Sequence, residues 1–160
     1  MLWIFIVGVS AAIIAIAVTV GQKRGKKLMD DGRMIKRDIS FVNTAELFTL
    51  TTVAFDGLID TIKTMDFSGT GASAESSREK EAVLFKAKGW TAQLYKVEDS
   101  DNKSIYCFSF TNWQTYRGIP QNGVQMNILI TEVEKAFLRL DPNTKVETAR
   151  VKTKTKSNFF

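Results

Sequence analysis

The sequence predicts an α+β protein in which a single N-terminal transmembrane helix is followed by a two-layer sandwich, a small antiparallel sheet of about four strands with two helices on one face. Three observations lead to this prediction. The first twenty residues are apolar, three later stretches alternate like strands, and two others repeat apolar residues every three to four positions. The predicted parts are an anchor helix over 1–21, a basic juxtamembrane linker over 22–38 and a soluble domain over 39–160.

The N-terminal segment carries no charged side chain over residues 2–20. About 19 residues rising roughly 1.5 Å each span roughly 28 Å, which is close to the hydrocarbon thickness of a bilayer. Small residues recur at the spacing that lets two membrane helices approach closely. We therefore expect a membrane-spanning helix with packing positions at Gly8, Ala11, Ala12 and Ala15.

A basic run follows the apolar segment and sets its expected orientation. Positive charges favour the cytoplasmic side and lie where anionic lipid headgroups are found. The expected location is the cell membrane, single-pass, with the domain facing the cytoplasm and with lipid contacts through Lys23, Arg24, Lys26 and Lys27. The alternative is an exported, extracytoplasmic domain, because Ala15-Ile16-Ala17 resembles a signal-peptide cleavage site.

The first helix of the domain is predicted over residues 44–65. Asn43 or Thr44 is placed to cap it, with Glu46 as the capping-box partner. Its apolar residues recur at helical spacing, at Leu47, Leu50, Ala54, Leu58, Ile62 and Met65. The Ser- and Gly-rich stretch 66–77 that follows is predicted to be a mobile loop.

Three strands of an antiparallel meander are predicted next, over 82–88, 90–97 and 104–113. Lys88-Gly89 indicates a tight turn, and the polar run 98–103 a longer one. Asn122 can cap a second helix that ends before Pro142. A last extended stretch, residues 145–156, completes the predicted sheet.

Composition excludes several kinds of site. The chain has no histidine, which is the commonest general base and metal ligand, and it has one cysteine. Cys107 lies in an apolar run, so we predict a buried structural thiol. We expect no catalytic residue, no cofactor, no metal site and no small-molecule substrate.

Two further groups have an ordinary structural explanation. Tyr106, Phe108 and Phe110 share one face of a strand, but the basic and glycine residues that accompany base-stacking aromatics are missing, so core packing is favoured. Asp56 and Asp60 lie side by side on a helix surface, and a solvated pair is favoured over an acid–base pair.

The last strand carries four cations on one side because strand side chains alternate: Arg150, Lys152, Lys154 and Lys156. The leading hypothesis is a membrane-anchored, non-catalytic protein-interaction or accessory domain of a larger assembly, with a protein partner or a homo-oligomer formed through the membrane helix. The alternative is a peripheral binder of anionic phosphates, of acidic lipid headgroups or nucleic acid, through these cations. Nucleic acid is disfavoured because the domain body is close to neutral. A third class is an enzyme that uses the sheet face as a ligand pocket.

Overall fold

The computed structural model describes residues 23–51, 55–100 and 102–150. The chain divides into two compact units, Met1–Lys36 and Arg37–Phe160. In the first unit, residues 23–30 are helical, and the Arg33 N–H closes the following turn by donating to the Leu28 carbonyl at 2.8 Å. The second unit is the folded domain.

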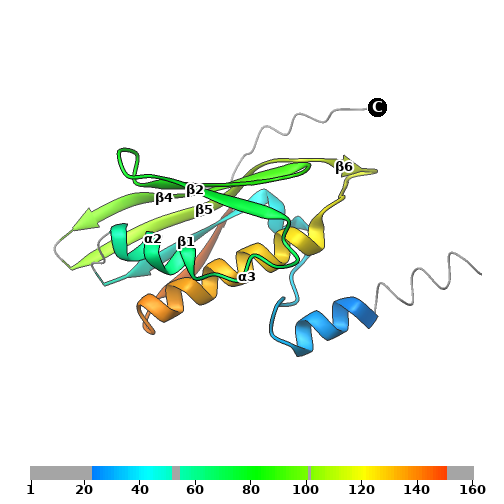
Figure 1. Ribbon diagram of the computed structural model, residues 1–160, viewed down its shortest axis with the longest axis horizontal. Coiled ribbons are helices and arrows are strands. Elements are labelled where there is room, and N and C mark those ends of the chain that lie inside the picture. The colour runs from blue at the N-terminus through cyan, green and yellow to red at the C-terminus, as the bar shows by residue number, and fades with distance from the viewer. Residues whose placement is uncertain (1–22, 52–54, 101, 151–160) are drawn as a thin grey trace, which may run out of the picture. The chain divides into compact units, whose positions relative to one another are not determined.

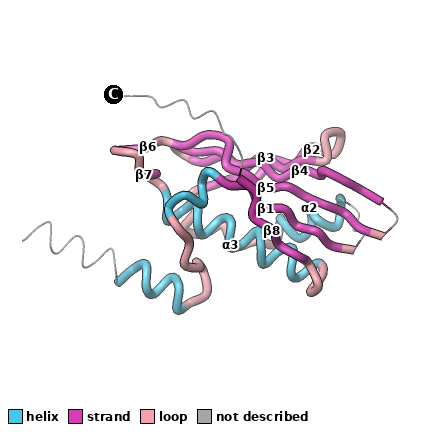
Figure 2. Tube along the Cα trace, turned by 180° about the vertical axis from the view of Figure 1, so that it is seen from behind, coloured by secondary structure: helices cyan, strands magenta, loops and turns pink. Residues whose placement is uncertain are grey.

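The domain is built on a six-stranded antiparallel sheet with the strand order β2-β3-β4-β5-β1-β8 (Figure 2). The strands are β1 (Thr44–Leu50), β2 (Ala72–Ser77), β3 (Ala82–Ala87), β4 (Trp90–Ser100), β5 (Lys103–Trp113) and β8 (Lys145–Arg150). A two-stranded ribbon, β6 (Thr115–Tyr116) and β7 (Ile119–Pro120), follows β5. Strand β1 is therefore an internal strand next to the edge, while β2 and β8 are the sheet edges.

Both α-helices of the domain lie on one face of the sheet, α2 (Phe55–Lys63) beside α3 (Gly123–Leu140) (Figure 1). The 3-10 helix η1 (Ile39–Asn43) immediately precedes β1. Asp38 caps η1 by accepting a hydrogen bond from the Ser40 N–H at 2.9 Å. Because strand side chains alternate, Phe48 and Leu50 of β1 both point toward the helices and are buried.

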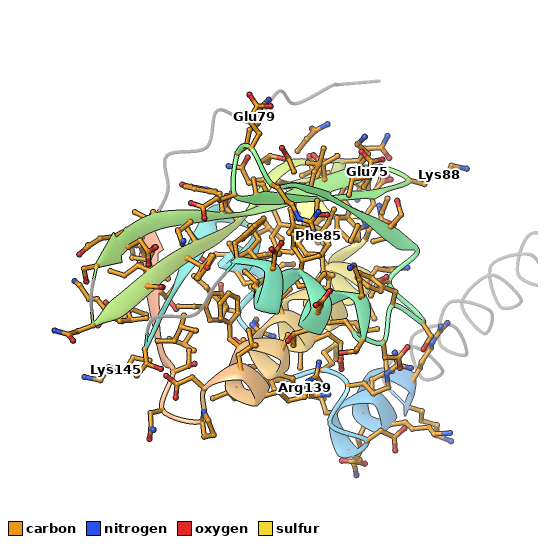
Figure 3. All side chains as sticks on the ribbon, turned by 60° about the vertical axis from the view of Figure 1, so that its left-hand side comes forward. Glu75, Glu79, Phe85, Lys88, Arg139 and Lys145 are labelled. Atoms are coloured by element: carbon orange, nitrogen blue, oxygen red, sulfur yellow. The ribbon has the colours of Figure 1, made fainter. Side chains whose placement is uncertain are left out.

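Aromatic rings fill the space between the sheet and the helices. Phe48 stacks on Phe137 of α3, with ring centroids 4.2 Å apart, and Phe108 contacts both Phe85 and Phe110. Figure 3 shows Phe85 between the sheet and α2, whereas Glu79 in the turn after β2 points outward. The core packing predicted for the aromatic residues of β5 is confirmed, because all three are buried.

The structure contradicts the predicted fold class. Among the residues that it describes, no helix is both long enough and apolar enough to cross a membrane. The sheet has six strands rather than about four. The segment 1–21 predicted as the anchor lies outside the described residues, together with its packing positions Gly8, Ala11, Ala12 and Ala15.

The first predicted helix is wrong in its N-terminal half. Residues 44–50 form β1, and α2 begins only at Phe55. Seven residues are too few to separate a period of two from a period of 3.6, and pairing with both β5 and β8 decides in favour of the strand. Part of the predicted loop 66–77 is also a strand, β2, which forms by pairing with β3 although its Ser and Ala residues have little strand preference.

Replacing Phe48 with Ala should lower the free energy of unfolding by about 3–5 kcal/mol, because it removes a buried ring and leaves a cavity against Phe137. Urea unfolding followed by circular dichroism measures the change. Leu84→Ala is the control, since Leu84 is 36% exposed on β3 and should lose less than about 1 kcal/mol. Equal losses in the two variants would contradict this placement of the core.

Candidate functional site

A buried polar cluster joins Arg37, two residues before η1, to β1 and α3. The Arg37 guanidinium donates from Nη1 to Asn127 Oδ1 at 2.6 Å and to Thr131 Oγ1 at 2.8 Å. Its Nη2 lies 2.5 Å from Glu134 Oε1, and its Nε lies 3.7 Å from Glu46 Oε1. The side chains of Arg37 and Glu46 are each only 8% exposed. These five residues are called the Arg37 cluster below.

The fold brings the cluster together from three directions. Asn127, Thr131 and Glu134 lie four and three residues apart on α3, so they share one helix face. Glu46 is two residues from Phe48 on β1 and therefore points to the same, helix-covered face of the sheet. In the strand register Glu46 lies between Phe108 of β5 and Thr148 of β8, both uncharged. Arg37 thus enters a site that already contains two carboxyl groups.

Glu46 is held in its protonated form. Burial raises the pKa of its carboxyl to about 8, with a further contribution from the charge of Glu134, while Arg37 acts in the opposite direction. With Glu46 neutral, Arg37 and Glu134 balance as a single ion pair.

The domain also exposes an apolar patch next to η1. Tyr116 and Ile119 are opposite one another across β6 and β7, and their side chains are 63% and 55% exposed. η1 packs against β7, and its Ile39 is 56% exposed. The Arg117 guanidinium lies over the Tyr116 ring, 5.3 Å from its centroid. Ile39, Tyr116, Arg117 and Ile119 are called the ribbon patch below.

The ribbon patch forms because the chain turns back sharply after β5. Arg117 and Gly118 both have positive φ, 51° and 79°, as in the tight turns that match strand twist, and glycine adopts this conformation at little cost. The Gln121 N–H closes the ribbon by donating to the Gln114 carbonyl at 3.0 Å. Tyr116 and Ile119 flank this turn, and their side chains remain largely outside the core.

Two hollows open beside the helices. One, of about 230 Å³, lies between α2 and the β2–β3 pair and is lined mainly by apolar residues such as Ile59 and Phe67. The other, of about 440 Å³, brings Gly69 and Gly71 of the loop next to Lys88 and Asn122, at the start of α3. Neither is lined by a paired acid and base. In the described part of the chain, no group of three or more Cys, Asp or Glu residues is arranged to hold a metal ion.

Of the four cations predicted on the last strand, the structure describes Arg150. It is exposed at the end of the edge strand β8, opposite Thr44. Lys152, Lys154 and Lys156 lie outside the described residues, so phosphate binding through this strand stays a prediction.

The basic run after the apolar segment is exposed. Lys23, Arg24, Lys26 and Lys27 all lie within the helical residues 23–30. No geometry bears on their contact with lipid or on the cellular location of the domain, and both stay predictions.

Two other predictions from the sequence are confirmed. Asp56 and Asp60 are exposed and pair with Arg78 and Lys63, in each case at 2.8 to 2.9 Å. Cys107 is a buried free thiol.

Sequence analysis missed both the Arg37 cluster and the ribbon patch. Arg37 was assigned to the linker, and Glu46 to a helix cap. One signal was present, because a strand over residues 44–50 places Glu46 on the same face as Phe48 and Leu50. A carboxyl group on an apolar strand face has to be paired or kept neutral, so Glu46 indicates a buried polar site.

No family model, curated protein or solved structure matches this chain.

We expect the free energy of unfolding to fall as the pH rises from about 5 to about 8. Glu46 has a pKa of about 8 in the folded domain and an ordinary value of 4.5 when exposed. The stability that it contributes is therefore complete below the lower value and is lost as the pH rises through the higher one. Urea unfolding at several pH values should show a loss of at least about 1 kcal/mol.

The matched variants are both Glu→Gln changes. Glu46→Gln keeps the site neutral and should remove the decline. Glu75→Gln changes an exposed carboxylate that pairs with Lys86 and should leave the decline in place. A wild-type stability that does not change over this pH range would show that Glu46 is ionised in the folded domain.

Proposed function

We propose that this domain is a non-catalytic interaction module that binds another protein through the ribbon patch. The observation that carries the proposal is the pairing of Tyr116 with Ile119, both more than half exposed, next to an arginine that lies over the tyrosine ring. The exposed Ile39 belongs to η1, which packs against β7. Tyrosine and arginine are enriched among the residues that dominate binding energy at protein interfaces. Exposed apolar clusters of this kind commonly mark interaction sites.

The two elements that carry the patch, η1 and the β6–β7 ribbon, are both attached to the core of the domain. β6 continues from β5, whose last residue, Trp113, is buried. Phe41 of η1 packs edge-on against Phe110 of β5, with ring centroids 5.8 Å apart. A partner would therefore meet side chains that are already in position, which lowers the entropy cost of binding.

The ionisable groups with displaced pKa values favour a structural role over catalysis. Glu46 lies in the buried Arg37 cluster. Burial alone would lower the pKa of Lys96, but the hydrogen bonds that its ammonium donates to Asp99 and Glu81 raise it instead. Neither Glu46 nor Lys96 lines either of the two hollows, so neither is placed to act on a ligand there.

Site-specific photocrosslinking tests the proposal in the full chain, within cells that produce it naturally. A benzophenone amino acid at Ile119 should give a discrete adduct with one protein, identified by mass spectrometry. Tyr116→Ser in the same chain should reduce the yield about tenfold or more, because it removes the central ring of the patch.

The control carries the same photoreactive residue at Leu84, which is partly exposed on β3. It should not give this adduct. Equal labelling from both positions, or a yield that Tyr116→Ser does not change, would overturn the proposal. An adduct with a second copy of the chain would identify the partner as the protein itself.

A further inference from the structure

The edge strand β2 lacks the usual protection against pairing with a further strand. It pairs with β3 without a bulge, and it contains no lysine and no proline. Its one charged residue, Glu75, pairs with Lys86 at 2.6 Å. The opposite edge, β8, exposes Lys145, Glu147 and Arg150. Because exposed charges oppose the addition of a strand, the two edges of the sheet are not equivalent.

The backbone of β2 directs hydrogen-bonding groups away from the sheet at Ala74 and Ser76. Only two residues connect β3 to β4, so Ala87, the last residue of β3, exchanges both of its hydrogen bonds with β4. Alternation then turns every second residue of β2, beginning with Ala72, away from β3. The Ala72 N–H agrees with this direction, because it donates to Thr70 Oγ1 at 3.0 Å. Among the hydrogen bonds described for the chain, none takes up the outward groups of Ala74 and Ser76.

The side chains of the same two residues face a hollow on the helix side of the sheet. Their partners on β3 are the buried residues Phe85 and Val83, and opposite residues share a face. Glu75, between them, points to the other face (Figure 3). Ala74 and Ser76 are nevertheless exposed, and they line the hollow of about 230 Å³ beside α2. The small side chains of this edge strand therefore leave space unfilled.

The lining of this hollow suits one large apolar side chain. Ile59 of α2 and Phe67 contribute apolar surface, and the charged residue of the lining, Lys63, already pairs with Asp60 at 2.9 Å. A charged side chain would therefore lose its hydration there without gaining a partner. Apolar cavities of about 150 Å³ accept a benzene ring, so the hollow has room for a side chain such as leucine or phenylalanine.

We propose that β2 is a docking edge for an extended segment of another protein, which adds a strand to the sheet and places one large apolar side chain in the hollow beside α2. The residue opposite Ala74 or Ser76 would share their face and so enter the hollow. In this mode of recognition, main-chain hydrogen bonds supply affinity and the hollow supplies selectivity. The site shares no residue with the ribbon patch, so it does not rest on the proposed function.

A second copy of the chain fits this edge less well. Its own β2 would bring only alanine and serine side chains to the hollow and leave it unfilled. Its β8 carries exposed charges, and pairing of β8 with β2 would join copies head to tail without closure.

Phage selection on the full chain tests the proposal, with random peptides of about ten residues as the probe. Selection in the presence of excess Ala74→Leu should recover peptides that prefer the wild-type chain, because the added leucine fills the hollow. These peptides should share one large apolar residue. The matched control Ser73→Leu places the same side chain on the other face of β2 and should bind them as the wild-type chain does.

The backbone contacts are tested with a synthetic peptide from this selection. Ser76→Pro removes an outward N–H and leaves the bonds to β3 in place, so it should weaken binding about fivefold or more in calorimetry. By NMR, the Ala74 and Ser76 amides should exchange rapidly in the free chain and at least about tenfold more slowly with peptide bound. The Glu75 amide faces β3 and should be protected in both states.

The proposal is overturned if no recovered peptide distinguishes the wild-type chain from Ala74→Leu, or if bound peptide leaves the exchange of Ala74 and Ser76 unchanged. Equal weakening by Ser73→Leu also overturns it. Urea unfolding checks each variant, and Ser76→Pro replaces Ala74→Leu as competitor if the latter does not fold. Protection of these amides that rises with the concentration of the chain alone would assign the edge to a second copy instead. Tyr116→Ser should leave peptide binding unchanged, so this site and the ribbon patch stand or fail separately.

Discussion

The rest of the domain depends on the pairing of β1 along both of its edges. Its residues are hydrogen-bonded partners of β5 on one side and of β8 on the other. Its end is also attached to the C-terminus of α3, because Asp141 Oδ2 accepts hydrogen bonds from the N–H and the hydroxyl of Thr51. Pairing on both sides fixes Phe48 against α3, and strand alternation directs the carboxyl group of Glu46 to the same buried side.

A carboxyl group in such a place is costly to ionise, and the domain limits that cost by keeping Glu46 neutral. Replacing a buried charge pair with apolar residues of similar size often leaves stability unchanged or improves it. For the stability of the domain alone, apolar residues in place of the Arg37 cluster would therefore serve as well or better. The geometry of the cluster has a different effect, since one guanidinium attaches the chain just before η1 to α3.

Local sequence patterns predict three of the six strands and the second helix close to their observed positions. The predicted strands over 82–88, 90–97 and 104–113 coincide with β3, most of β4 and most of β5, because alternation and aromatic residues act over short distances. The second predicted helix coincides with α3, whose stop is marked by Pro142. Strand β1 was missed because its partners lie far along the chain, and β2 because pairing, not composition, makes it a strand. The Arg37 cluster requires register and helix packing together, which no local pattern contains.

The pairing of β1 with β8 has a consequence for the order in which the domain assembles. Thr44 and Arg150 are partners in the sheet, so β1, which is synthesised first, pairs with the last strand of the described residues. During synthesis, the sheet edge of β1 and the ring of Phe48 stay without their final neighbours until almost the whole domain has left the ribosome. The unpaired edge of β1 is therefore available to other extended segments during this interval, which is the condition under which nascent chains misassociate.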